Sequence, residues 1–131
     1  QVLLGRRQPE QVNQEIFTFY RNLLAAVKQM PSDSKWQLCA VKGWEDNQSC
    51  HKILAYGWKS KHKAFLIVVN YANHSSQGRV IIPWKVQSQK EVEFSDLFGK
   101  EPFLRNGIEI ATEGLFIDLP AWGFHFFTLT V

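Results

Sequence analysis

The stretch Ala64-Phe-Leu-Ile-Val-Val-Asn-Tyr71 decides the fold class of this sequence. Residues 64–69 are apolar without interruption, and the run has the length of a strand. A strand that is apolar on both faces is expected to be covered by protein on both sides. Residues 64–71 are therefore predicted to form a central strand of a sheet.

A period of two in apolar residues extends the sheet on both sides of this strand. In residues 90–95 the alternation places Val92 and Phe94 inside and Glu91 and Glu93 outside. Short strands separated by turn residues about every ten positions are typical of an antiparallel sandwich or barrel. We predict a mainly β fold, an antiparallel Greek-key β-sandwich, with strands over residues 36–41, 52–58, 64–71, 79–84, 90–97, 108–111, 115–119 and 124–131.

One amphipathic α-helix is predicted before the sheet. Pro9 suits the first turn of a helix, Asn13 offers a second cap, and Pro31 ends the segment. The apolar residues have the three-to-four spacing of one helix face. They are Val12, Ile16, Phe19, Tyr20, Leu23, Leu24 and Val27, with Phe17 and Met30 at the margins. Residues 1–31 are thus an N-terminal segment with a helix, and residues 32–131 are an all-β domain.

Composition limits the classes of function. The chain has 131 residues and 15.2 kDa, enough for one domain, and 45% hydrophobic residues exclude global disorder. A formal net charge of +3 is too small to indicate nucleic acid as a partner. No apolar run reaches the roughly 18 residues of a membrane span, so no membrane partner is expected. The N-terminus has neither an initiator Met nor the residue order of a signal peptide, which is expected of a piece of a longer protein.

The two cysteines are predicted to be free thiols. If residues 36–42 pair with residues 51–58, Cys39 lies opposite Leu54 and Cys50 lies beside Gly43, roughly 13 Å away. A disulfide needs Cα atoms within about 7 Å. Free thiols favour a reducing compartment, and hence the cytoplasm, to a small degree.

No residue is predicted to bind a metal or cofactor or to act in catalysis. The four histidines lack a compact ligand spacing, and His125 is expected to be a satisfied core or edge residue. The two candidate carboxylate pairs are residues 91 and 93 and residues 45 and 46. Both lie among polar neighbours, so neither has the apolar surroundings that would keep one carboxyl protonated as an acid.

The five tryptophans leave one candidate binding site. Four of them lie in or beside strands and are expected to pack in the core or at a domain interface: Trp36, Trp58, Trp84 and Trp122. Trp44 lies in a loop with Glu45, Asp46 and Asn47, whose polar groups suit sugar hydroxyls. Trp44 either packs like the others or forms a sugar-binding platform with Glu45 and Asp46.

Four phrases of the sequence, in this order, resemble the end of α-amylase-type glycoside hydrolases. Ile16-Phe-Thr-Phe-Tyr-Arg-Asn-Leu-Leu24 resembles their last barrel helix, and residues 64–71 resemble a strand of their C-terminal β domain. Val92-Glu-Phe-Ser-Asp-Leu-Phe-Gly99 and residues 114–127 are similar to two later phrases of that domain. The resemblance covers residues 9–131. Residues 27–28 and 57–58 depart from it, which leaves subfamily and substrate open.

The resemblance implies a non-catalytic role. In that family the catalytic carboxylates lie on a (β/α)₈ barrel of about 250 residues, which 131 residues cannot hold. The chain would be a C-terminal accessory domain that stabilises the missing upstream barrel of a glycoside hydrolase or glucan-acting transglycosylase, with weak α-glucan contact. Two alternatives are a free-standing carbohydrate-binding module and a small hydrolase that uses its own carboxylates.

The resemblance also predicts a domain interface on the helix. The β domain is expected to cover one side of the helix through Leu23 and Val27. Phe17, Tyr20 and Leu24 are expected to form the interface with the barrel, and Met30, at the margin of the apolar stripe, is expected to face the barrel too. Without the barrel this face would stay exposed, and the isolated chain is expected to self-associate as a dimer.

Overall fold

The computed structural model describes residues 5, 8–86, 91–99 and 101–131. Lys90, the first residue of one predicted strand, and residues 1–4 and 6–7 of the N-terminal segment lie outside the described residues. The prediction of a mainly β chain preceded by a helix is confirmed. The elements are α1 Gln14–Val27, β1 Lys35–Lys42, the 3₁₀ helix η1 Ser49–Lys52, β2 Ile53–Lys59, β3 Lys63–Asn70, β4 Ser76–Ile81, β5 Glu91–Asp96, β6 Phe103–Asn106, α2 Gly107–Glu113, β7 Leu115–Leu119 and β8 Phe124–Thr130.

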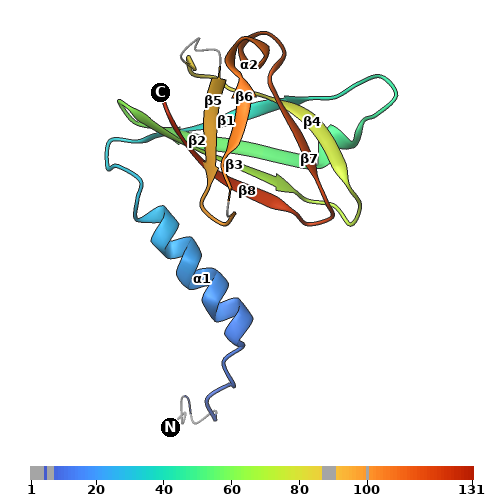
Figure 1. Cartoon of the computed structure of the whole chain (residues 1–131). Coiled ribbons are helices and arrows are strands. Elements are labelled where there is room, and N and C mark those ends of the chain that lie inside the picture. Colours follow the sequence, from blue (N-terminus) through green and yellow to red (C-terminus); the bar gives the residue numbers. More distant parts are fainter. Residues whose placement is uncertain (1–4, 6–7, 87–90, 100) are drawn as a thin grey trace.

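Within the described residues, eight strands form one antiparallel sheet in the order β6-β5-β8-β3-β2-β1-β4-β7. The sheet curls, so that β5, β6 and β7 cross over β1, β2 and β3 and the body is almost a barrel (Figure 1). The expected Greek-key sandwich of two sheets is not confirmed. One reason is that β1 is shared: its residues 35–39 pair with β2, and its residues 40–42 pair with β4.

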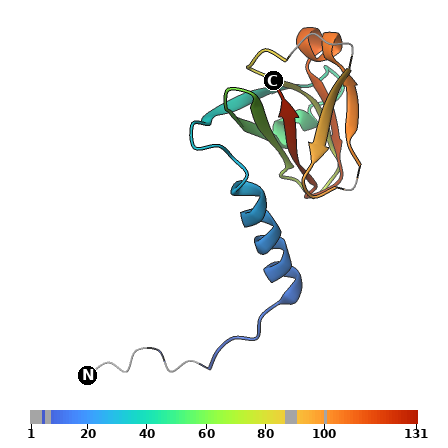
Figure 2. The same ribbon diagram turned by 60° about the vertical axis from the view of Figure 1, so that its left-hand side comes forward.

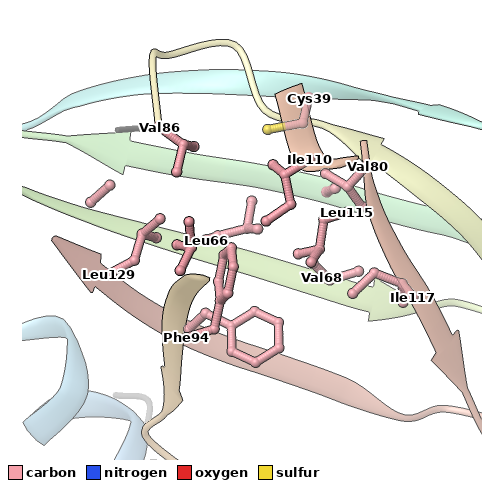
Figure 3. Close-up of a cluster of buried hydrophobic side chains, with 14 of the residues drawn as sticks. Cys39, Leu66, Val68, Val80, Val86, Phe94, Ile110, Leu115, Ile117 and Leu129 are labelled. Carbon is pink, nitrogen blue, oxygen red and sulfur yellow. The ribbon is translucent and has the colours of Figure 1, made fainter. Parts of the chain in front are cut away.

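The central strand β3 is buried on both faces, as its composition predicts. Leu66 and Val68 face the inside of the curl, where they meet Phe94 of β5 and Leu115 of β7 (Figure 3). The alternate residues Phe65 and Ile67 face outwards into a second apolar cluster. Burial of large apolar side chains on both faces contributes on the order of 2 kcal/mol for each side chain.

Helix α1 begins at Gln14 because Asn13 caps it. The Asn13 side chain accepts hydrogen bonds from the backbone N–H groups of Glu15 (3.1 Å) and Ile16 (3.3 Å). The expected start at Pro9 was therefore wrong, and the second candidate cap is the one used. The C-terminal end of α1 is connected to the β body, and the helix projects away from that body (Figure 2). Among the described residues no helix is long and apolar enough to cross a membrane.

Helix α2 replaces a predicted strand. The strand expected over residues 108–111 was wrong, because Asn106 caps a helix by accepting from Ile108 N (2.9 Å) and Glu109 N (3.2 Å). Gly114 ends this helix at a φ of 98°, a conformation that favours glycine. The short strand β6, which precedes α2, was not predicted.

The second strand that differs from expectation is β4. It begins at Ser76, three residues before the predicted start, and it therefore contains Gly78. Position 78 of this strand requires a glycine, because a Cβ there would lie 2.7 Å from Val41 Cγ1. β4 also ends at Ile81, before Trp84, whose indole is buried against Gly57.

Candidate functional site

Helix α1 uses one side to contact the β body. Phe19, Leu23 and Ala26 follow each other at steps of four and three residues, which places them along one line of the helix, and Met30 lies just past its end. Ala26 is buried and Leu23 and Met30 pack against the outer cluster of the sheet. The Phe19 ring meets Phe98 and Phe124 at 5.8 Å between centroids.

Two expectations for this contact were wrong. Val27 was expected to be covered by the β domain, but it is exposed. It follows Ala26 directly and therefore points about 100° away from it around the helix. Met30 was expected at the margin that faces the barrel, but it packs on the β domain.

A second side of α1 is apolar and exposed. Phe17 is 50% exposed, Tyr20 57% and Leu24 61%, and Ile16 and Val27 are exposed beside them. The Arg21 guanidinium lies over the Phe17 ring at 5.9 Å. The structure therefore exposes all three residues predicted for a domain interface, and their contact with a barrel stays a prediction.

Exposed apolar side chains also lie on the sheet. β1 and β2 place three exposed apolar side chains, Trp36, Leu38 and Leu54, on the outer side of the curl. Trp36 lies opposite Trp58 in the register, and its ring is 6.3 Å from that of Tyr56. The open apolar face is the name used below for Ile16, Phe17, Tyr20, Leu24, Val27, Trp36, Leu38 and Leu54.

The predicted sugar platform lies in a tight turn after β1. Trp44 and Asn47 exchange backbone hydrogen bonds (3.1 and 3.0 Å), which leaves Glu45 and Asp46 at the tip of the turn. The ring of Trp44 lies 6.0 Å from that of Phe116 on β7, with an interplanar angle of 56°. Trp44 is 36% exposed and Phe116 43%.

Sequence reasoning missed Phe116. A signal for it existed, since alternation in residues 115–119 places Phe116 and Asp118 on the outer side of the strand. Asn47 supports the turn that carries Trp44, because its side-chain amide donates to Gln77 Oε1 at 2.7 Å. Glu45 and Asp46 stay predicted sugar contacts.

Two tryptophans expected to pack are exposed. Trp36 lies on the open apolar face, and Trp122 is 60% exposed in the turn between β7 and β8. That turn is closed by Gly123 N donating to Pro120 O (2.9 Å), and Trp122 holds a φ of 58° at its tip. Trp122 contacts Tyr71 edge-on, with an interplanar angle of 89°.

The carboxylates that the sequence analysis weighed are exposed. Glu91 and Glu93 border a hollow of about 520 Å³, together with Ser95, Thr128 and Thr130. Val86 also lines this hollow and is followed by residues 87–90, which the structure does not describe, so no site is built on it. Among the described residues no group of three or more His, Cys, Asp or Glu side chains could hold a metal ion.

Titratable groups inside the fold include a histidine–aspartate pair and two free thiols. His125 is satisfied, as predicted, on the interior strand β8: its Nδ1 lies 2.8 Å from Asp96 Oδ2, and Asp96 Oδ1 accepts from Phe98 N at 3.0 Å. Cys39 and Cys50 are free, as predicted, although Cys39 lies opposite Ala55 rather than Leu54. Burial raises the pKa of the Cys39 thiol to about 11, so this thiol is neutral and weakly nucleophilic at pH 7.

Comparison with known proteins adds one distant similarity. No protein-family model and no curated protein matches the chain. Among solved structures, the chain is similar to a catalytic mutant of Gan42B, a GH42 β-galactosidase from G. stearothermophilus, with 11% sequence identity and a TM-score of 0.38. The match covers 90% of this chain and 13% of that chain, and a similarity of this degree supports no conclusion about function.

Proposed function

We propose that this chain is a non-catalytic accessory domain of an α-amylase-type glycoside hydrolase or glucan-acting transglycosylase. Its role is to stabilise the catalytic barrel through the open apolar face. The four sequence phrases of residues 9–131 support the family, and the exposure of Phe17, Tyr20 and Leu24 is the observation that carries the role. We expect no turnover of starch or maltooligosaccharides by the chain alone.

The division of α1 into two apolar sides supports this role. A helix that served only the β domain would need one apolar stripe about 100° wide. α1 has such a stripe in Phe19, Leu23 and Ala26, and these residues already make its contact with the β body. The further apolar side, with Tyr20 and Leu24, is left for a second neighbour. In the resemblance, α1 corresponds to the last helix of the barrel. This correspondence supports the barrel as the second neighbour.

The proposal can be tested by introducing two negative charges on α1 in a longer protein that contains these residues and the barrel. We expect Phe17→Glu with Leu24→Glu to lower the melting temperature of the barrel by roughly 5 °C, because the docked helix would bury two unpaired charges. The same substitutions should leave the unfolding free energy of the 131-residue chain within about 0.5 kcal/mol at concentrations where it is monomeric, since both side chains are exposed there. Calorimetry on both proteins measures the two effects.

The matched control uses the same spacing on another side of the helix. Thr18 and Ala25 are also seven residues apart and exposed, and they lie about 100° from Phe17 and Leu24 around the helix. Thr18→Glu with Ala25→Glu adds the same charge and should leave the barrel's melting temperature unchanged. Equal effects of the two pairs, or none from either, would contradict the proposed role of the open apolar face.

A further inference from the structure

A second candidate binding surface lies on the outer side of β4 and β7, away from α1 (Figure 1). Its centre is the tilted pair of Trp44 and Phe116, which is called the aromatic corner below. These two rings come from segments more than 70 residues apart and are brought together by the pairing of β4 with β7. No residue of the aromatic corner belongs to the open apolar face.

Polar side chains border the aromatic corner in fixed positions. The register sets Gln77 opposite Asp118 and Arg79 opposite Phe116 on adjacent strands. The Gln77 amide donates to Asp118 Oδ1 at 3.4 Å and accepts from Asn47 at 2.7 Å. The Arg79 guanidinium lies 5.8 Å from the centre of the Phe116 ring and is held by an ion pair with Glu109 at 2.9 Å.

These polar groups still have free hydrogen-bonding capacity. A carboxylate accepts about four hydrogen bonds and a guanidinium donates five, so Asp118 and Arg79 can each serve a ligand while keeping the contacts described. The network also fixes the side chains before any ligand arrives, which lowers the entropy cost of binding.

A small cavity adjoins the aromatic corner. Phe116 and Asp118 are on its wall, and the cavity of about 120 Å³ continues between β7 and the β5–β6 pair, where Arg105 and His125 line it. β6 and β7 are the two edges of the curled sheet, so this cavity marks the place where the sheet does not close. The surface therefore combines exposed rings, a polar border and a recess large enough for one ring substituent.

The chemistry of this surface matches a sugar. A pyranose ring has an apolar face of C–H groups, which stacks on aromatic rings, and a rim of hydroxyls, which bonds to amides, carboxylates and guanidinium groups. A phosphate chain would be repelled by Asp118, Glu109 and Glu113, which surround the corner.

We infer that the aromatic corner binds a glucan chain, with Trp44 and Phe116 stacking on its sugar rings. Gln77, Asp118 and Arg79 bond to the hydroxyls. This site goes beyond the proposed docking role and is independent of it, since α1 takes no part. Either can fail without the other.

NMR titration of the chain with maltoheptaose tests the inference, with cellohexaose as the β-linked comparison. We expect saturable shifts of the Trp44 indole N–H with a dissociation constant on the order of 1 mM. Trp44→Ala and Phe116→Ala should each weaken binding about tenfold, because each removes one stacking surface. Trp44→Phe keeps a ring and should retain most of the affinity, which separates loss of stacking from loss of fold.

Trp122→Ala is the matched control, since Trp122 is also an exposed tryptophan with an aromatic neighbour. It should bind maltoheptaose like the unmodified chain. The two oligosaccharides distinguish an α-linked from a β-linked ligand. The inference is overturned by an absence of saturable shifts with both of them, or by a loss of binding in Trp122→Ala instead of Trp44→Ala.

Discussion

The isolated chain is expected to form a symmetric dimer through α1, and the Phe17→Glu, Leu24→Glu variant is expected to remain monomeric. The open apolar face exposes these residues with Tyr20 between them at helical spacing, and contiguous apolar surfaces of this kind associate in water. A two-fold dimer uses the same patch on both copies, so each substitution enters the interface twice. We expect the association constant to fall at least 100-fold, measured by sedimentation equilibrium over a wide concentration range.

The Thr18→Glu, Ala25→Glu variant is again the control, and it should dimerise like the unmodified chain. Circular dichroism must show that both variants keep α1. A chain that stays monomeric at high concentration with α1 fully ordered would contradict the prediction, because the helix would then need no second neighbour.

Asn70→Ala is expected to lower the free energy of unfolding by about 3 kcal/mol, a large part of the 5–15 kcal/mol typical of a domain. Asn70 is fully buried at the end of β3. Its amide nitrogen donates to the backbone oxygens of His74 (2.8 Å), Pro120 (2.9 Å) and Leu119 (3.2 Å). Alanine would leave these acceptors without a donor in a closed part of the fold, where such groups are costly.

Urea unfolding measures the loss, and Asn73→Ala provides the comparison. Asn73 is exposed three residues later, so its substitution should change stability by less than about 0.5 kcal/mol. Asn70→Asp has the same shape but cannot donate, and it should be at least as unstable as Asn70→Ala. Unfolding of Asn70→Asp like the unmodified chain would show that the amide donors do not hold this end of the sheet.

Local patterns predicted the parts of the fold that depend on near neighbours. The run over residues 64–69 identified β3 as central, and alternation placed Val92 and Phe94 in the core correctly. The pair Asn106-Gly107 can form a hairpin turn or open a helix, so it does not by itself distinguish the predicted strand from α2. Asn106 is the N-cap of α2, and only burial of Ile110 with exposure of Ile108 distinguishes the helix from a strand.

The remaining features of the fold and of the candidate site depend on pairing between strands distant in sequence, which no local sequence pattern specifies. A single curled sheet instead of two sheets follows from the change of partner along β1. The same is true of the aromatic corner. Trp44 was a candidate from its loop position, but its neighbour Phe116 is set by the register of β4 with β7, so Glu45 and Asp46 were chosen for being adjacent in sequence.

The two surfaces would divide the work of the domain. By these two proposals, the open apolar face would dock on the barrel, and the aromatic corner, which shares no residue with that face, would contact a glucan chain. A domain built in this way could hold polymer near the barrel without contributing a group to catalysis. Substitutions at the corner should therefore change glucan affinity and leave barrel stability unaltered.

Hydrogen exchange of the α1 amides tests the docking role most directly. The measurement compares the 131-residue chain, diluted until it is monomeric, with the longer protein that carries the barrel. We predict that the amides of Tyr20 and Leu24 exchange at least 100-fold more slowly in the longer protein, because the barrel covers the open apolar face there. Equal exchange of these amides in the two proteins would contradict the account.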